Sequence, residues 1–225
     1  MKIIFFGNTI KNLVNFRKNL ILNFIDKNNQ IYLIFQKEHK NNEYQNFFLK
    51  NGCKTYEVDF DRHSINPIKE LRTFYKLFKI YNKIKPHITF NFTIKPNIYG
   101  SIISRFLKIY SINNITGLGY FFFKKGFIKF FLILLYKISI KKSYHNFFHN
   151  EEDSIYFIKN KLIFKNKYTI IPGSGIDFNY YKFCKYPKNL NVKFLFIGRL
   201  IKEKGIYEFL NTAKEIKKSK YNCEF

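Results

Sequence analysis

The first 172 residues alternate between short apolar runs and segments in which apolar residues recur at helical spacing. Such alternation is typical of β–α–β units, whose parallel strands are covered by helices on both faces of the sheet. The runs are nearly continuous in apolar character, as expected of strands buried on both faces. We therefore predict an α/β, Rossmann-like domain over residues 1–172, with strands at residues 3–6, 31–35, 55–58, 88–92, 110–115, 144–148 and 168–171.

Helical spacing and capping residues predict the helices between these strands. Asn66 and Pro67 provide an N-cap and a first helical position, Gly52 provides a C-cap, and Asn150 precedes three acidic residues that suit a helix N-terminus. We expect one face of the third helix to carry Leu71, Phe74, Tyr75 and Phe78. The predicted helices cover residues 12–26, 44–49, 68–84, 97–107 and 126–141, and one more follows Asn150.

The pattern changes after residue 172, where a Pro-Gly-Ser-Gly turn leads into a polar connector over residues 173–191. A new strand is expected at residues 192–197, a helix at 205–219 and the first residues of another strand at 221–225. A single β–α unit cannot bury both of its faces, because a stable sheet needs more strands. We therefore expect residues 192–225 to be the start of a second Rossmann-like domain that is truncated here. A one-domain protein with a C-terminal appendage is the alternative.

The chain is strongly basic, with 40 Lys and Arg against 15 Asp and Glu, a net charge of +25. Only five of the basic residues are arginines, the residue preferred for recognising phosphates and bases, so we do not expect a nucleic-acid partner. The abundance of Lys, Asn, Ile, Phe and Tyr together is typical of an AT-rich coding sequence. A basic surface also suits contact with anionic lipid.

The cysteines and the N-terminus indicate a cytoplasmic protein. Cys53, Cys184 and Cys223 are widely spaced and form no C-x-x-C pair, which predicts neither a disulfide framework nor a zinc site. The apolar run at the N-terminus is too short for a signal peptide.

Ligands of open parallel sheets bind beyond the carboxyl ends of the strands, which directs attention to four loops. These loops cover residues 7–10, 93–96, 116–120 and 198–205. In the last loop, Arg199 and Lys204 flank the start of a helix, where two cations and free backbone N–H groups can hold a diphosphate. A solvated basic turn is the alternative. Gly117 and Gly119 lack the third glycine of a dinucleotide-binding fingerprint, and no Walker A or Ser-hydrolase motif is present.

Six stretches, in order along the chain, carry a resemblance to a known family. They are Arg62-His-Ser-Ile-Asn66-Pro67, Thr93-Ile-Lys-Pro-Asn-Ile-Tyr-Gly100, Ile115-Thr-Gly-Leu-Gly-Tyr120, Asn150-Glu-Glu-Asp153, Ile171-Pro-Gly-Ser-Gly-Ile-Asp177 and Phe196-Ile-Gly-Arg-Leu-Ile-Lys-Glu-Lys-Gly205. With them the chain resembles family-4 GT-B glycosyltransferases of the branch that builds capsule, lipopolysaccharide or lipid-linked oligosaccharides. The resemblance extends to galactosaminyltransferases that act on undecaprenyl-diphosphate-linked bacillosamine.

The resemblance implies transfer of a sugar, with retention of configuration, from a nucleotide-sugar such as a UDP-sugar to a lipid-linked or cell-surface glycan. It implies two facing Rossmann-like domains and neither a metal nor another cofactor. Arg199 and Lys204 would hold the donor diphosphate, which the loop of Gly7 and Asn8 would approach from the first domain. The acceptor side would be lined by Lys95, Thr116, Gly117, Leu118, Gly119 and Tyr120.

The family carries two glutamates seven residues apart in its second domain. This pair of glutamates has no counterpart in the present sequence. We therefore expect that the 225 residues alone do not turn over. An inactive remnant of such an enzyme, or a basic nucleic-acid-binding protein, are the alternatives. Residues 126–141 combine aromatic and lysine residues, as in an interfacial helix on the cytoplasmic face of a membrane, or as in a core helix that covers the sheet.

Overall fold

The computed structural model describes residues 1–37, 43–60, 66–117, 127–185, 191–219 and 221–225. These residues form two compact units, Met1–Asp177 and Phe178–Phe225, and each unit is described by itself. The domain boundaries expected at residues 172 and 192 stay predictions.

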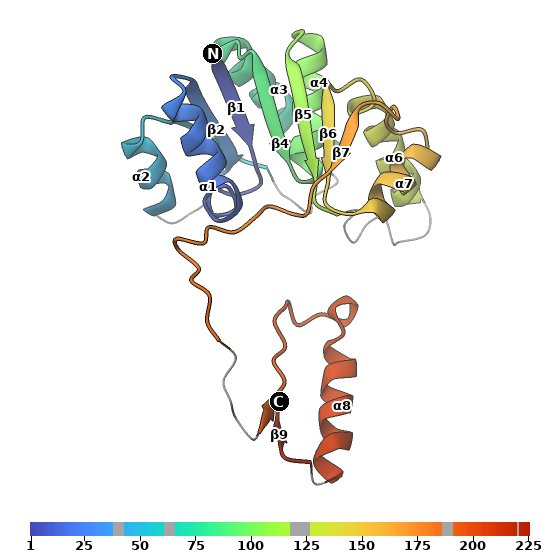
Figure 1. Ribbon diagram of the computed structural model, residues 1–225. Coiled ribbons are helices and arrows are strands. Elements are labelled where there is room, and N and C mark those ends of the chain that lie inside the picture. Colours follow the sequence, from blue (N-terminus) through green and yellow to red (C-terminus); the bar gives the residue numbers. More distant parts are fainter. Residues whose placement is uncertain (38–42, 61–65, 118–126, 186–190, 220) are drawn as a thin grey trace. The chain divides into compact units, whose positions relative to one another are not determined.

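The first unit is built on a seven-stranded sheet in which every neighbouring pair of strands is parallel (Figure 1). The strand order is β3-β2-β1-β4-β5-β6-β7, so the direction in which strands are added reverses between β1 and β4. All seven predicted strands are present. They are β1 (Lys2–Phe6), β2 (Gln30–Gln36), β3 (Lys54–Val58), β4 (Ile88–Phe92), β5 (Tyr110–Ile115), β6 (His145–Phe148) and β7 (Tyr168–Ile170).

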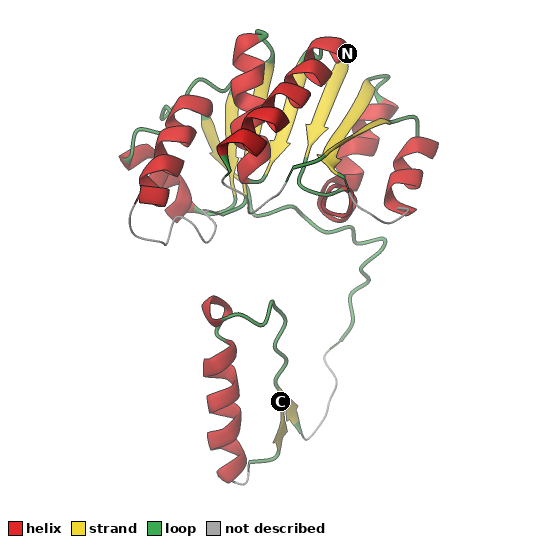
Figure 2. Cartoon of the chain, turned by 180° about the vertical axis from the view of Figure 1, so that it is seen from behind, coloured by secondary structure: helices red, strands yellow, loops and turns green. Residues whose placement is uncertain are grey.

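Helices cover both faces of this sheet, as continuous apolar strands require. One face packs against α1 and α2 through a core that contains Phe5, Leu13 and Phe48. The other face, toward the viewer in Figure 2, packs against α3 and α4 through Leu77, Tyr81 and Ile103. The helices of this unit are α1 (Ile10–Asp26), α2 (Glu43–Lys50), α3 (Pro67–Ile84), α4 (Ile94–Phe106), α6 (Phe127–Ser139) and α7 (Glu151–Lys159).

Side-chain caps fix where several of these helices begin. The Asn66 side chain accepts hydrogen bonds from the backbone N–H groups of Ile68 and Lys69, at 3.0 and 3.3 Å. Asn150 accepts one from the N–H of Asp153 at 2.7 Å. Both N-caps expected from the sequence are confirmed, and each satisfies backbone donors that a helix start leaves without partners.

Two expectations about the helices need correction. The buried residues of α3 are Thr73, Leu77, Tyr81 and Ile84, and of the predicted stripe Phe74 and Phe78 pack against this core. Leu71 and Tyr75 are 70% and 57% exposed, because Tyr81 reaches into the sheet to bond Thr89 and so sets the rotation of the helix. Helix α4 begins at Ile94 rather than at residue 97, since Pro96 is compatible with the first turn of a helix.

A row of asparagine amides crosses the sheet on its α4 face. Asn91, Asn113 and Asn146 stand opposite one another on β4, β5 and β6. Asn91 Nδ2 donates to Asn113 Oδ1, and Asn113 Nδ2 donates to Asn146 Oδ1, each at 3.0 Å. All three side chains are buried, so a polar, hydrogen-bonded row lies inside this half of the sheet beside an apolar core that contains Ile115 and Phe148.

The second unit contains two short parallel strands, β8 (Val192–Lys193) and β9 (Cys223–Glu224), and the helix α8 (Ile206–Lys218). A 3₁₀ turn, η1 (Lys202–Lys204), precedes α8. The strand expected at residues 192–197 is therefore shorter than predicted, while the helix and the start of the last strand are confirmed. Phe209 of α8 packs against Phe196 and Phe225, with ring centroids 5.5 and 5.7 Å apart.

Candidate active site

The reversal of strand order between β1 and β4 places the ligand-binding edge of the first unit at the carboxyl ends of these two strands. The loops that leave this edge begin with Gly7 after β1, Thr93 after β4 and Thr116 after β5. They coincide with three of the loops that the sequence indicated. The geometry at each loop shows what it can bind.

The loop after β1 is tightly fitted around Gly7. The Gly7 N–H donates to the carbonyl of Ile34 at 3.0 Å, and a Cβ atom on Gly7 would lie 2.9 Å from Leu13 Cδ2. The side-chain oxygen of Asn8 is buried without a hydrogen-bond partner in the described part of the chain. Thr9 then caps α1 by accepting from the N–H of Asn12 at 3.1 Å. A residue larger than glycine would displace either the Leu13 side chain or this loop.

Thr93, after β4, has a backbone conformation normally reserved for glycine, with φ 78° and ψ 171°. It is the N-cap of α4, yet its side chain makes no capping hydrogen bond. Its hydroxyl oxygen is buried and has no partner within the described residues. Strained backbone and unmatched polar atoms gather at functional sites, so Thr93 belongs to the candidate site. This strain could not be predicted from the residue type, since threonine rarely adopts a positive φ.

Lys95 lies in the first turn of α4, and its ammonium group forms an ion pair with Glu70 of α3 at 2.7 Å. Both side chains are largely buried, which shields the pair from solvent. The charge of Lys95 is thus partly compensated within the protein. Its predicted role on the acceptor side stays a prediction.

The loop after β5 is described only at its start. Thr116 is exposed, and Gly117 has φ 149°, a conformation that favours glycine. The other predicted acceptor-side residues, Leu118, Gly119 and Tyr120, lie outside the described residues.

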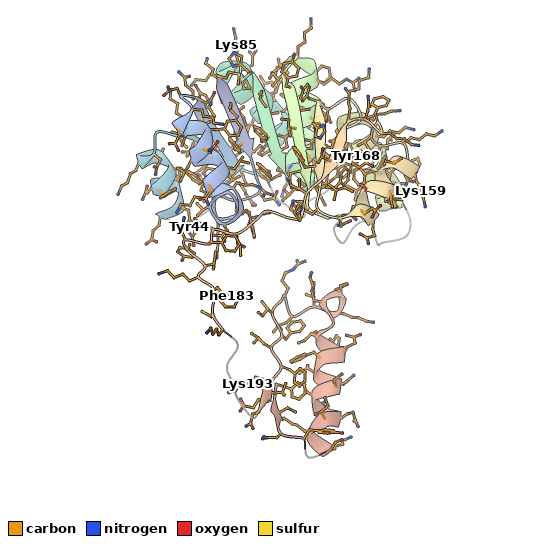
Figure 3. The ribbon with its side chains drawn as sticks, in the orientation of Figure 1. Tyr44, Lys85, Lys159, Tyr168, Phe183 and Lys193 are labelled. Atoms are coloured by element: carbon orange, nitrogen blue, oxygen red, sulfur yellow. The ribbon has the colours of Figure 1, made fainter. Side chains whose placement is uncertain are left out.

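A buried arginine adds positive charge to the same edge. Lys85 and Lys159 are exposed at the surface (Figure 3), whereas Arg17 of α1 is only 8% exposed. Its Nη2 donates to Asn114 Oδ1 near the end of β5 at 3.3 Å, and its guanidinium lies 4.6 Å from the centre of the Phe92 ring at the end of β4. Burial lowers the pKa of Arg17 to about 10. Sequence reasoning missed Arg17, because its hydrogen bond to Asn114 joins residues that are 97 positions apart in the chain.

Unmatched polar atoms concentrate along this edge. Among the described residues, six buried side-chain polar atoms have no hydrogen-bond partner. Four of them belong to residues at or just after the carboxyl ends of strands β1, β2, β4 and β6. Buried polar atoms are normally paired, so this concentration is the expected signature of a site whose ligand supplies the partners. The four are Asn8 Oδ1, Gln36 Oε1, Thr93 Oγ1 and His149 Nε2.

Arg199 and Lys204 lie together in the second unit, in the loop that leads into α8. The N–H of Ile201 donates to the carbonyl of Arg199 at 2.8 Å, and the N–H of Lys204 donates to that of Ile201 at 3.0 Å. Both side chains are exposed, and neither forms an ion pair with a described residue. Gly205 follows with φ 78° and leaves the start of α8 without a side-chain cap. Two free cations beside uncapped N–H groups can hold a diphosphate. Because Gly7 and Asn8 belong to the other unit, the structure does not place them against this loop.

A family model described as "Glycosyl transferase 4-like" matches residues 2–150, which include the whole edge from Gly7 to His149. The chain belongs to the glycosyl transferase 4-like family. The resemblance inferred from the six sequence stretches is thereby confirmed.

Two curated relatives of this glycosyl transferase 4-like chain are each 27% identical to it. One is the N,N'-diacetylbacillosaminyl-diphospho-undecaprenol alpha-1,3-N-acetylgalactosaminyltransferase of Campylobacter jejuni, matched over 96% of this chain and 61% of the relative. The other is the capsular polysaccharide biosynthesis glycosyltransferase CapM of Staphylococcus aureus, matched over 72% of this chain and 46% of the relative. The chain thus spans less than two thirds of the length of either relative.

Solved structures show the same fold. Anabaena Alr3699/HepE, in a complex with UDP and glucose, matches 96% of this glycosyl transferase 4-like chain and 58% of its own, with a TM-score of 0.65 and 13% identity. A glycosyltransferase from Rickettsia africae matches 80% of this chain and 45% of its own, with a TM-score of 0.57 and 12% identity. The α/β fold of GT-B type expected from the sequence is confirmed.

Helix α6 of this family member presents an apolar face to solvent. Phe130, Phe131, Leu134 and Ile138 are exposed, while Tyr136 packs into the core. The helix therefore covers the sheet with one face, as a core helix does, and leaves the other uncovered. The interfacial role of the uncovered face stays a prediction. Within the described residues, every helix is too short or too polar to cross a bilayer.

Proposed function

We propose that this chain is part of a glycosyltransferase that moves a sugar from a UDP-sugar to a lipid-linked glycan acceptor, with retention of configuration. The concentration of unmatched polar atoms at the carboxyl edge, within residues 2–150 that match the family model, carries the proposal. The names of the relatives support a lipid-linked acceptor, and the Anabaena complex supports a uridine nucleotide.

In this proposal, Arg199 and Lys204 hold the donor diphosphate and stabilise the leaving nucleotide as negative charge develops on it. Gly7 and Asn8 approach the same phosphates, in a loop that packs closely on Leu13 because Gly7 has no Cβ. Lys95, Thr116 and Gly117 belong to the acceptor side, together with Leu118, Gly119 and Tyr120. No metal is needed, since the cations and helix N-termini supply the positive charge.

The proposal is tested by incubating the complete enzyme, of which this chain is proposed to be a part, with labelled UDP-sugars and an undecaprenyl-diphosphate-linked saccharide, because the 225 residues alone are expected not to turn over. We expect label to move into the lipid fraction with one of the UDP-sugars. If UDP binds and no UDP-sugar labels the lipid, the lipid-linked acceptor is wrong. If neither UDP nor a UDP-sugar binds, the whole assignment is wrong.

Neutralising the cations of the second unit is expected to weaken nucleotide binding. R199Q and K204Q should each raise the dissociation constant for UDP about tenfold, because each removes a charge-assisted hydrogen bond to phosphate. Calorimetric titration with UDP measures the change. K217Q, which removes an exposed charge from the far end of α8, serves as the control. An equal effect of K217Q would show that only the net charge matters.

We further propose that the exposed face of α6 contacts a membrane peripherally, on its cytoplasmic side. A double variant, F131E and L134E, should reduce the fraction bound to anionic vesicles at low salt by about tenfold, since it removes apolar contact and adds repulsion. Co-sedimentation measures the bound fraction. I68E and L71E change two equally apolar, exposed residues of α3 and should have little effect. Failure of the unaltered protein to bind the vesicles would contradict the proposal.

A further inference from the structure

Arg17 is a buried cation with incomplete compensation. It projects from the middle of α1, and its guanidinium makes two hydrogen bonds, from Nη1 to the carbonyl of Phe16 at 3.1 Å and from Nη2 to Asn114 Oδ1 at 3.3 Å. Both acceptors are neutral, and the second bond is long. A guanidinium has five N–H donors, so its capacity is not exhausted by these two contacts.

No carboxylate of the described residues lies within ion-pair distance of Arg17. The Phe92 ring, 4.6 Å from the guanidinium carbon, offers a cation–π contact, which is weaker than an ionic partner. Burial of a charge without a counter-charge costs free energy, and proteins seldom retain it without a use. The lowered pKa of Arg17 has the same physical cause.

The position of Arg17 indicates what its use is. The two side chains that contact its guanidinium, Phe92 and Asn114, end or nearly end strands β4 and β5, so the charge lies at the edge where ligands of such sheets bind. His149 follows β6 on the same edge, and its Nε2 is buried without a partner among the described residues. Phe148 pairs with Ile115, so His149 follows β6 next to the end of β5 that carries Asn114, the acceptor of Arg17. Burial, and next the charge of Arg17, lower the pKa of His149, in agreement with this placement.

We propose that Arg17 and His149 form an anion-binding subsite that takes a phosphate group at the carboxyl ends of β4, β5 and β6. The planar guanidinium fork matches two phosphate oxygens, which suits a phosphate better than a halide or a neutral sugar hydroxyl. When its Nε2 carries the proton, the His149 ring donates to a third oxygen. The residues of this subsite belong to the first unit, whereas Arg199 and Lys204 belong to the second.

Two sources can supply such a phosphate, the diphosphate of a lipid-linked acceptor or that of a nucleotide. Pyrophosphate alone tests the shared chemistry, and the comparison of farnesyl diphosphate with UDP distinguishes the sources. The inference does not depend on the proposed function, because binding of an inorganic anion is measured whether or not a sugar is transferred.

The decisive variant is N114D. It replaces the neutral acceptor of Arg17 by a carboxylate of the same shape, which neutralises the cation from within the fold. We expect the affinity for pyrophosphate at near-physiological salt to fall at least about tenfold, since a charge-assisted interaction is removed. The protein should remain folded, because a buried ion pair replaces a neutral contact. R17M is a second variant, interpretable if its circular dichroism spectrum is unchanged.

The titrations are made in the R199Q/K204Q background, so that the loop in the second unit does not contribute. R72Q removes one exposed arginine of α3 and matches the change in net charge. It should alter pyrophosphate binding less than about twofold, since exposed charges contribute little at this salt. Tighter binding of farnesyl diphosphate than of UDP would assign the subsite to the acceptor, and the reverse order would assign it to the nucleotide.

The His149 ring provides a readout that a purely structural Arg17 would not affect. A phosphate beside Arg17 offsets its positive charge, so the pKa of His149, followed by NMR, should rise when pyrophosphate is added. In N114D it should not respond to pyrophosphate. The inference is overturned if the protein with N114D binds pyrophosphate as tightly as the protein with Asn114 in the same background. It is also overturned if the R199Q/K204Q protein binds no pyrophosphate.

Discussion

Replacing Asn113 by alanine is expected to lower the free energy of unfolding of the first unit by about 4 kcal/mol, because it strands several buried polar partners at once. The Asn113 amide uses its full hydrogen-bonding capacity. Its Oδ1 accepts from Asn91 Nδ2 at 3.0 Å and from Ser101 Oγ at 2.9 Å. Its Nδ2 donates to Ser143 Oγ at 2.7 Å and to Asn146 Oδ1 at 3.0 Å.

The alanine would leave a small cavity and four polar groups from β4, β6, α4 and the turn before β6 with fewer partners. A leucine would fill the space and still leave those groups unpaired, so N113L should be no more stable. Urea unfolding followed by circular dichroism measures the change. N51A, at an exposed asparagine with one hydrogen bond, should cost about 1 kcal/mol or less. A similar loss for N51A and N113A would contradict the account of the buried network.

At Gly100 of α4, adding a single methyl group should greatly lower the free energy of unfolding. A Cβ atom there would lie 2.1 Å from Asn91 Oδ1 and 2.5 Å from Asn91 Cγ. The Asn91 side chain cannot move aside, because it accepts from Thr89 and donates to Asn113. We expect G100A to cost about 3 kcal/mol or more, through overpacking and a broken hydrogen bond. Helix propensity alone predicts a gain of about 1 kcal/mol for the same change.

The opposite signs of these two effects make G100A a sharp test. G52A provides a contrast, since a Cβ on Gly52 meets nothing within 4 Å and its φ of 81° alone should cost about 1 kcal/mol. Shortening Asn91 should relieve the clash, so the double variant G100A/N91S should lose less than the sum of the two single losses. Additive losses would show that Asn91 is not the obstacle.

The strands could be predicted from the sequence because runs buried on both faces leave an unbroken apolar signal. The caps at Asn66 and Asn150 could also be predicted, since capping is a local interaction. The buried face of α3 could not be predicted, because apolar residues occupy more than one of its faces. A hydrogen bond between the hydroxyl groups of Tyr81 and Thr89 decides the rotation of the helix. Local pattern indicates that a helix is amphipathic and leaves open which apolar face meets the sheet.

The candidate site was predictable to the level of loops. The carboxyl-end rule identified the loops after β1, β4 and β5, and with them Gly7, Asn8 and Lys95. Thr93 and Arg17 were missed for two physical reasons. Thr93 was missed because its positive φ is disfavoured for threonine. Arg17 was missed because only the folded sheet brings its partner, Asn114, near it.

The asparagine row has a consequence for how the strands choose their neighbours. Strands that are apolar on both faces bury hydrocarbon in more than one alignment, so apolar burial alone does not select one. A one-residue slip of β5 would turn Asn113 to the opposite face of the sheet and bring Ile112 or Asn114 opposite Asn91 and Asn146. With Ile112 there, the amides of Asn91 and Asn146 lose their partner, and with Asn114 there, Arg17 loses the acceptor that it has in the observed alignment. The row and this contact together select one register of β4, β5 and β6. They thereby fix the positions along the strands at which Thr93, Thr116 and His149 leave the sheet.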